Sequence, residues 1–342
     1  VVITVSHSFI ATANSIRFCN AEPVFVDIDL KTYNADIESL RETLERNCRI
    51  AASGMFYKEI GRLVTPESPL RYIRPEKKEW GGVGAILVVH QMGMPADMPS
   101  ILKLARKYSL PVVEDAACAI GSEIRAKDGK SFDKIGKPHG DVACFSFHPR
   151  KIITTGDGGM LTTNNSKYDR IFRLLRHQGM SVSDLARHKA KRIVFEEYLS
   201  LGYNYRLTDI QAAIGLAQLR KLPQIIAKRR QLASRYIKLL SNIPWLALAE
   251  EPISARTNWQ SFPVRLLKGA PVNRNRLMQK LLDQGITTRS GIMNAHEQKI
   301  YKNSKWRLPF SEKASRDVVL LPLFQAMEIE QINLVCEAIK NA

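Results

Sequence analysis

The sequence lacks long hydrophobic runs. No apolar stretch approaches the roughly 20 residues that a helix needs to cross a bilayer, and no signal peptide is visible. Cysteine is also scarce. The five cysteines are scattered, odd in number and without a CxxC pair. This pattern excludes a disulfide framework and gives no indication of a zinc site. We therefore expect no membrane association and no bound metal, and a reducing cytoplasm is the simplest location.

Acidic residues are few. The chain has 33 of them against 51 lysines and arginines, which gives a net charge of +18 over 342 residues. Such an excess can serve nucleic-acid binding, but the basic residues are spread along the chain and no nucleic-acid module is recognisable. Local basic clusters, at Arg71 to Lys78, Arg187 to Arg192 and Lys228 to Arg230, are expected to be solvated faces. We predict no nucleic-acid partner, and at this length two packed domains.

One lysine stands in an unusual setting. The run Val142 to Phe147 reads as a buried strand that stops at Pro149, because proline cannot extend a ladder. Lys151 follows, and then a glycine-rich loop leads into a second strand, Met160 to Thr163. Glycines let the backbone approach a ligand closely, so Lys151 could act as an amine nucleophile towards a carbonyl group. The alternative is an ordinary solvated lysine beside a turn.

A second stretch ends in paired carboxylates. The run PVVEDAACA, from Pro111 to Ala119, predicts a parallel strand whose carboxyl end carries Glu114 and Asp115. Ligands of open α/β sheets bind at that edge. An aspartate there can accept a hydrogen bond from a protonated pyridine nitrogen and so hold the ring's positive charge. The alternative is that both residues cap a following helix.

With these stretches, the sequence resembles the pyridoxal-phosphate-dependent nucleotide-sugar aminotransferases, the DegT/StrS-like family. The matching segments occur in the family's order: SHSFIATANSI (Ser6 to Ile16), PVFVDID (Pro23 to Asp29), ILVVHQMGMPADM (Ile86 to Met98), VVEDAACAIGS (Val112 to Ser122), FSFHPRKIITTGDGGM (Phe145 to Met160) and GYNYRLTDIQAAIGLAQL (Gly202 to Leu219). The resemblance implies an α/β, aspartate-aminotransferase-like (type I) fold with a mostly parallel central sheet. It places a large cofactor-binding domain at 1–222, and an interdomain helix with a small α+β domain at 223–342.

The resemblance also implies the roles of individual residues. Lys151 would bind pyridoxal 5'-phosphate covalently and Asp115 would face its ring nitrogen. Other cofactor contacts are implied for Phe9 (stacking), Ser146 (phosphate), Cys118 (where the family commonly has His or Gln), and Asn204 and Arg206 (reaching the neighbouring subunit). Phe9 could instead be ordinary core. A homodimer with shared active sites follows, and His296 in the segment GIMNAH is the candidate for substrate contact.

The implied activity is an aminotransferase. Glutamate would donate the amino group to a nucleotide-linked keto-deoxysugar, as in polysaccharide or antibiotic sugar assembly, and the positive surface would attract the nucleoside diphosphate. One alternative is a sugar dehydratase of the same fold, which carries histidine where this chain has Lys151. The other is a non-catalytic regulatory or scaffold protein, because the family's Gly-Thr-Ala segment before the first strand is absent from the sequence.

Further elements follow from local patterns. The chain departs from the family at about 49–84, which we interpret as a peripheral insertion that lines the substrate entrance. His90 ends an apolar strand and is expected to make a structural hydrogen bond. Helices are predicted at Ile10 to Phe18, Asp36 to Cys48, Pro99 to Tyr108, Tyr168 to His177, Gln224 to Leu240, Asn273 to Gln284, from about Ser311, and Glu328 to Lys340.

Overall fold

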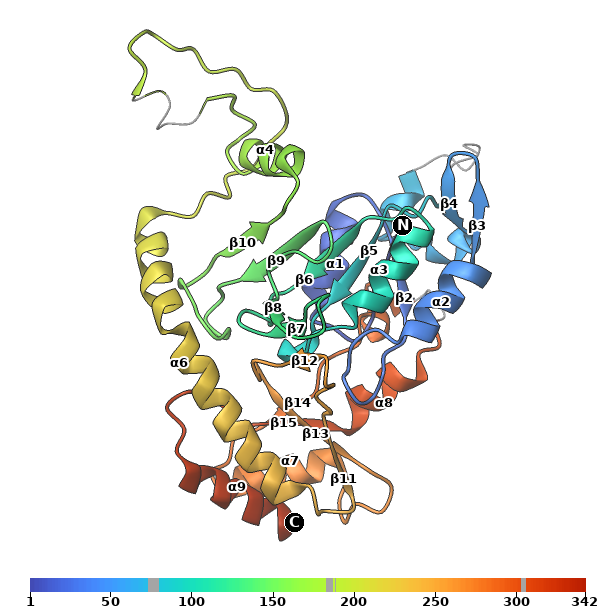
Figure 1. Cartoon of the computed structure of the whole chain (residues 1–342). Helices are drawn as coiled ribbons and strands as arrows, with labels where there is room; N and C mark the ends of the chain where they lie inside the picture. The colour runs from blue at the N-terminus through green and yellow to red at the C-terminus, as the bar shows by residue number, and fades with distance from the viewer. Residues whose placement is uncertain (73–79, 183–186, 188, 303–305) are drawn as a thin grey trace.

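A six-stranded sheet forms the centre of the computed structural model, which describes residues 1–72, 80–182, 187, 189–302 and 306–342 (Figure 1). Its strand order is β10-β9-β6-β5-β1-β2. The strands are β1 (Val2–Val5), β2 (Pro23–Val26), β5 (Ala85–Val89), β6 (Val112–Asp115), β9 (Val142–Ser146) and β10 (Gly159–Thr162). All pairs are parallel except β9 with β10. The predicted mostly parallel α/β fold is confirmed.

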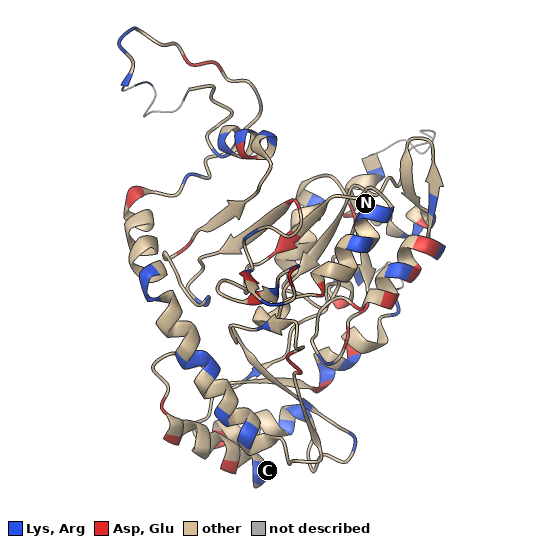
Figure 2. Cartoon of the chain, viewed as in Figure 1, with Lys and Arg blue, Asp and Glu red and all other residues tan. Residues whose placement is uncertain are grey.

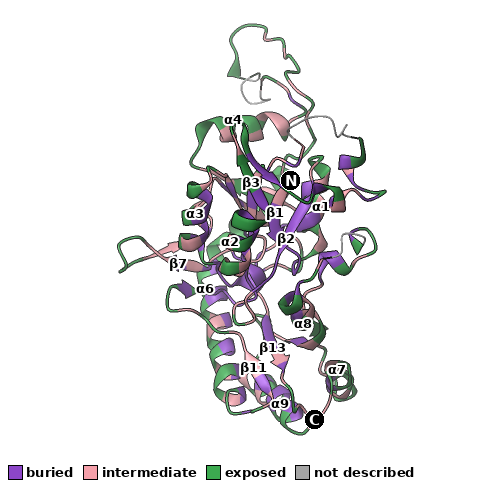
Figure 3. Cartoon of the chain, turned by 90° about the vertical axis from the view of Figure 1, so that its right-hand side faces the viewer, coloured by how far each residue is buried: buried purple, intermediate pink, exposed green. Residues whose placement is uncertain are grey.

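Helices connect the parallel strands. They are α1 (Ile10–Phe18), α2 (Ile37–Arg46) and α3 (Met98–Lys107). The side chain of Asp36 caps α2 by accepting from the Ser39 N–H, and Asp97 caps α3 in the same way through Ser100. Because β1, β5, β6 and β9 run in one direction, their carboxyl ends meet at one edge of the sheet. Figure 3 shows buried, purple segments in the middle of the molecule around β1 and β2, where the core lies.

The stretch that departs from the family begins with a hairpin. Strands β3 (Cys48–Ala51) and β4 (Gly54–Tyr57) pair antiparallel and are followed by 3-10 turns η1 (Ile60–Leu63) and η2 (Pro69–Tyr72). The hairpin lies at the rim of the molecule beside α2 (Figure 1). Apolar side chains of the hairpin and of η1, such as Tyr57 and Leu63, are nonetheless part of the main core. A role at the substrate entrance stays a prediction, and residues 73–79 lie outside the described ones.

A smaller antiparallel sheet follows in the C-terminal part, in the order β11-β13-β15-β14. Its strands are β11 (Leu246–Leu248), β13 (Phe262–Leu266), β14 (Arg289–Ser290) and β15 (Val318–Leu321), and its helices are α7 (Arg274–Asp283), α8 (Pro309–Asp317) and α9 (Ile329–Lys340). Short strands β7 (Glu123–Arg125), β8 (Phe132–Lys134) and β12 (Ala255–Arg256) form a third sheet. Since β12 pairs with β7, this sheet joins the C-terminal part to the loop after β6.

One long helix, α6 (Asp209–Leu240), replaces the two helices expected on either side of Pro223. Thr208 and Gln211 form a capping box at its start. Proline removes one helical hydrogen bond, but apolar residues on both sides of it are buried. Leu222, Ile225 and Ile226 cluster with Ile152 and Ile153, whereas Leu232, Tyr236 and Leu240 belong to the core of the small sheet. The domain boundary that we propose at 222/223 therefore lies inside a continuous helix.

The described part of the chain contains no helix long and apolar enough to cross a membrane, and no cluster of potential metal ligands. Lysines and arginines are distributed over helices, strands and loops in the view of Figure 2, without one concentrated stripe. The remaining helix of the N-terminal half, α4 (Ser166–Leu175), lies apart from the core and leads into a long excursion that returns at α6 (Figure 1).

Candidate active site

Lys151 lies in the loop beyond the carboxyl end of β9. Its backbone N–H donates to the carbonyl of His148 in a tight turn, and the next two residues, Ile152 and Ile153, are buried against α6. The Lys151 amine (Nζ) lies 3.1 Å from the thiol sulfur (Sγ) of Cys118. Cys118 follows Asp115 by three residues in the turn after β6. The loop after β9 therefore brings Lys151 to the turn that follows Asp115.

Asp115 is the last residue of β6, and its carboxylate is held from two sides. One oxygen accepts the Thr12 hydroxyl at 2.8 Å, and the other accepts the Ala117 N–H at 3.1 Å. The Thr12 hydroxyl also lies 2.8 Å from that of Ser8. A turn, not a helix, follows β6 in the described chain, so the expected alternative that Asp115 caps a helix is wrong. No sequence pattern indicates Thr12 as a site residue, although its position in the first turn of α1 places it at this edge.

Glu114 forms a buried pair behind the site. Its carboxylate lies 3.0 Å from His90 Nε2, and neither side chain is exposed. Burial alone would raise the pKa of Glu114, but hydrogen bonds from His90 and the Gly140 N–H hold that pKa below its ordinary value. The other ring nitrogen of His90 accepts from the Ala96 N–H. The structural role predicted for His90 is confirmed, and the pair fixes β6 beside β5.

Phe9 and Ser146 lie at the same edge of the sheet. Phe9 precedes the first turn of α1, and its side chain is 61% exposed, so the expectation that it belongs to the core is wrong. An exposed aromatic face beside Thr12 suits a stacking role, which stays a prediction. Ser146 ends β9, and its hydroxyl accepts from the His148 N–H at 3.3 Å. Its predicted contact with a phosphate is likewise untested.

The half-buried thiol of Cys118 adjoins the Lys151 amine. Burial raises the pKa of this thiol, and the nearby positive charge of Lys151 offsets only part of that effect. The thiol is therefore neutral at neutral pH, and it can adjoin the lysine without forming an ion pair with it. A neutral neighbour leaves the amine available for covalent chemistry.

Three predicted site residues lie elsewhere. Asn204 and Arg206 are exposed in the excursion before α6, where Tyr203 and Tyr205 donate to the backbone of 175–176. His296 is 7% exposed, with Nδ1 2.6 Å from the Ser6 hydroxyl and Nε2 3.6 Å from Glu312. This histidine ties the loop before α8 to the end of β1. Its protein partners favour a structural role over the predicted substrate contact.

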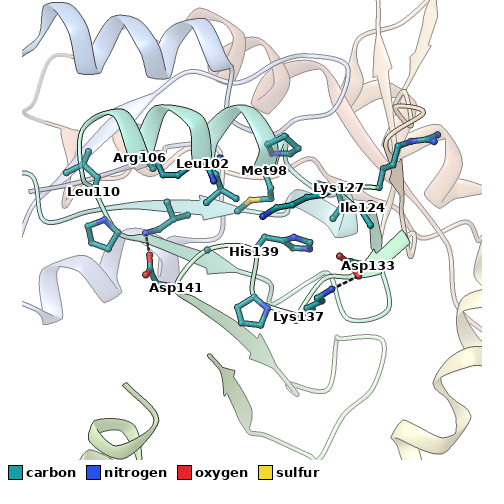
Figure 4. Close-up of a pocket in the computed structure, with 18 of the residues that line it drawn as sticks. Met98, Leu102, Arg106, Leu110, Ile124, Lys127, Asp133, Lys137, His139 and Asp141 are labelled. Atoms are coloured by element: carbon teal, nitrogen blue, oxygen red, sulfur yellow. Dashed lines mark hydrogen bonds and ion pairs between the residues drawn. The ribbon is translucent and has the colours of Figure 1, made fainter. Parts of the chain in front are cut away.

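Two cavities deserve comparison. The larger of the two, about 1290 Å³, lies between α3 and the β7–β8 hairpin at the amino ends of β6 and β9 (Figure 4). Met98, Leu102 and His139 line it, and none of the predicted site residues does. A second cavity of about 420 Å³ is lined by Lys151 itself, together with Arg229 and Arg289. Of the predicted site residues only Lys151 lines the smaller cavity, which therefore adjoins the loop after β9.

These residues fit a pyridoxal cofactor. The Lys151 amine can reach an aldehyde, the anchored Asp115 carboxylate can face a ring nitrogen, and Phe9 offers an exposed aromatic face. A lysine–carboxylate pair at the carboxyl edge of a parallel sheet also suits a ligand held outside the strand ends. The fit rests on side chains contributed by α1, β6 and the loop after β9.

Comparison with known proteins gives the same answer. The sequence profile of the DegT/DnrJ/EryC1/StrS aminotransferase family matches residues 1–340. The protein MJ1066 of Methanocaldococcus jannaschii is 30% identical over 345 residues, which cover 99% of this chain and 78% of that protein. Among solved structures, the aminotransferase TlmJ of Streptoalloteichus hindustanus is similar with a TM-score of 0.78 and 28% identity, covering 99% of this chain and 78% of the other. The sugar aminotransferase CalS13 of Micromonospora echinospora has a TM-score of 0.77 and 25% identity, covering 100% and 80%.

The family match spans nearly the whole chain, and the solved aminotransferase structures share its fold. Members of this family are aminotransferases that use pyridoxal phosphate. The chain belongs to the DegT/DnrJ/EryC1/StrS aminotransferase family.

Proposed function

We propose that this chain transfers an amino group from glutamate to a keto-deoxysugar carried on a nucleotide. The observation that carries the proposal is the contact of the Lys151 amine with Cys118, at 3.1 Å. Cys118 lies in the turn after β6, and the Ala117 N–H of the same turn donates to the Asp115 carboxylate. The sugar acceptor is supported by the likeness to CalS13, which is described as a sugar aminotransferase. The net charge of +18 favours binding of an anionic nucleotide.

Each residue has a defined task in this reaction. Bound pyridoxal phosphate supplies an electron sink that stabilises charge on the carbon undergoing proton transfer. Asp115 accepts the N–H of the protonated ring, and Thr12 and Ala117 keep its carboxylate in that orientation. Lys151, when released from the cofactor, moves the proton at the substrate carbon with its amine as general base and then acid. Cys118 keeps a neutral group beside that amine.

We also propose that two copies of the chain complete each other's sites through Asn204 and Arg206. Support comes from the exposed apolar side chains that flank these residues in the chain, since clustered exposed apolar residues are typical of interaction surfaces. The most exposed side chains there are Ile193 (85%), Phe195 (84%), Leu201 (89%), Tyr205 (73%) and Ile210 (76%). Burial of this surface against a second copy would place both polar residues at a subunit boundary.

The cofactor assignment is tested with Lys151→Ala. Because the lysine supplies the covalent link, we expect this variant to lose the visible absorbance of the bound cofactor and all amino-group transfer, whereas Lys167→Ala on α4 keeps both. The measurement is a spectrum after addition of pyridoxal phosphate, followed by mass analysis of keto-sugar nucleotides incubated with glutamate. Normal turnover by Lys151→Ala would refute the assignment.

The same assay separates the alternatives. If the parent protein takes up no pyridoxal phosphate, the scaffold interpretation gains and the aminotransferase proposal fails. If a deoxygenated sugar forms in place of an amino sugar, the dehydratase interpretation replaces it.

A further inference from the structure

The 420 Å³ cavity at Lys151 is strongly cationic. Its lining includes four basic residues and, among the residues that the structure describes, no aspartate or glutamate. The basic residues are Arg150, Lys151, Arg229 and Arg289. One wall is the loop after β9, and the other is formed by β14 and by the chain following β15. Four like charges around a small space repel one another, so an anion would bind there favourably.

Arg229 is the least usual of the four. It lies on α6 and is 6% exposed. Its guanidinium donates from Nε to the Trp259 carbonyl and from Nη2 to the Gln260 carbonyl, both at 2.9 Å. These contacts use two of its five N–H donors. In the described part of the chain no carboxylate pairs with it.

The charge of Arg229 is therefore buried with two carbonyl contacts but without a carboxylate counter-ion in the described part of the chain. Burial lowers the pKa of this guanidinium to about 10, which still leaves it protonated at neutral pH. A buried ion without a counter-ion costs several kcal/mol, and a bound anion would recover part of that cost. Carbonyl contacts fix the orientation of the group in advance, which lowers the entropic cost of binding.

Other lining groups complete a polar site. Hydroxyls of Ser261, Thr287 and Thr288 lie among the lining residues, and Arg289 is on the solvent side. Gln260 donates from Nε2 to the Arg150 carbonyl at 2.9 Å, which joins the two walls of the cavity. Its other side-chain atom, Oε1, is buried and has no hydrogen-bond partner in the described structure. The site thus offers mainly donors, and one acceptor for an N–H or hydroxyl group.

We infer that this cavity binds a carboxylate of the amino donor, with Arg229 as the buried counter-ion and Arg289 as the exposed one. The donor's role rests on the proposed function. Its nitrogen must reach the position served by the Lys151 amine, so a carboxylate on the same small molecule falls within the cavity that Lys151 lines. Guanidinium groups match planar carboxylates through paired hydrogen bonds.

Binding of glutarate, an unreactive dicarboxylate, tests this site without turnover. We expect calorimetry on the purified protein to give at least about tenfold weaker glutarate binding for Arg229→Gln and for Arg289→Gln, since each loses a charge-assisted contact. Arg230→Gln is the matched control. Its neighbouring guanidinium donates to the Thr257 carbonyl and does not line the cavity, so this variant should bind glutarate like the parent.

The outcomes are distinct. If Arg229→Gln fails to fold by circular dichroism, Arg289→Gln decides, because its side chain is exposed. Unchanged glutarate affinity in the folded arginine variants would overturn the inference. It would also be overturned if UDP displaced glutarate at lower concentrations than succinate does, because the cavity would then prefer a nucleotide to a carboxylate. If glutarate binding depends on the arginines but no amino transfer occurs, the proposed function fails and the carboxylate site remains. If glutamate supports amination with an unchanged KM in both variants, the inferred carboxylate site is refuted and the proposed aminotransferase function remains.

Discussion

His7 makes the stability of the protein depend on pH. It lies two residues beyond the end of β1 and has no exposed surface. Nδ1 lies 2.9 Å from Asn294 Oδ1, while Nε2 is buried and has no hydrogen-bond partner in the described structure. Burial lowers the pKa of His7 from 6.5 to about 4, and the contact with Asn294 offsets only part of that. A second proton, on Nε2, would make the ring a buried cation, and the new N–H would have no acceptor in the described structure.

The direction of the effect follows from these values. Because the folded pKa lies below the unfolded one, the unfolded chain binds the proton first. The stabilisation is complete above pH 6.5 and is lost as the pH falls towards 4. The difference corresponds to at most about 3 kcal/mol of unfolding free energy, of which about 2 kcal/mol is lost between pH 8 and pH 5.

Urea unfolding at pH 8 and pH 5 measures this contribution. We expect the parent to lose about 2 kcal/mol more than His7→Gln over that interval, since glutamine does not titrate. His148→Gln is the control, because His148 is only partly buried and lies outside this contact. Other buried groups with lowered pKa values, such as His139 and Glu114, act in all three proteins and cancel in the comparison. An equal loss in parent and His7→Gln would refute the reasoning.

Two further predictions concern the site and the assembly. Thr12→Val removes the hydroxyl that orients Asp115. In steady-state kinetics kcat/KM should therefore fall roughly tenfold, as expected for about 1.4 kcal/mol of lost hydrogen bonding. Thr12→Ser keeps a hydroxyl and should recover the parent value. Ile210→Asp places a charge on the exposed apolar surface before and within α6. Light scattering should therefore show a monomer for this variant and a dimer for the parent. A parent protein that is already monomeric would contradict the proposed sharing of Asn204 and Arg206.

The central sheet could be predicted because its strands are short apolar runs between turn signals. The end of β6 and the loop after β9 are far apart in the sequence, and they meet because parallel strands end at one edge. The small sheet was less predictable. Its strand β15 (Val318–Leu321) follows α8 directly, without a glycine or proline to separate them. A four-residue apolar run in that position cannot be distinguished from the end of a buried helix.

Side-chain partners from distant segments were beyond the sequence patterns. The hydrogen bond from Thr12 to Asp115 spans 103 positions, and no local spacing indicates it. Pro223 misled the prediction of helix ends for a related reason. Its local preference is to stop a helix, but one core buries Leu222, Ile225 and Ile226 around it, a second core buries the residues from Leu232 onward, and this packing outweighs one missing hydrogen bond.

Arg229 shows how a charge run can hide a functional position. The cluster Lys228 to Arg230 was expected to be a solvated face, and for Arg229 that expectation is wrong, because its side chain is buried. Helical spacing contains the missing signal. The buried residues of α6 recur every three or four positions: Leu222, Ile225, Ile226, Arg229, Leu232, Ala233, Tyr236 and Leu240. An arginine in the middle of such an apolar stripe is expected to be largely buried when the helix is formed, and its guanidinium, which has carbonyl partners but no carboxylate among the described residues, is the group on which the inferred anion site rests.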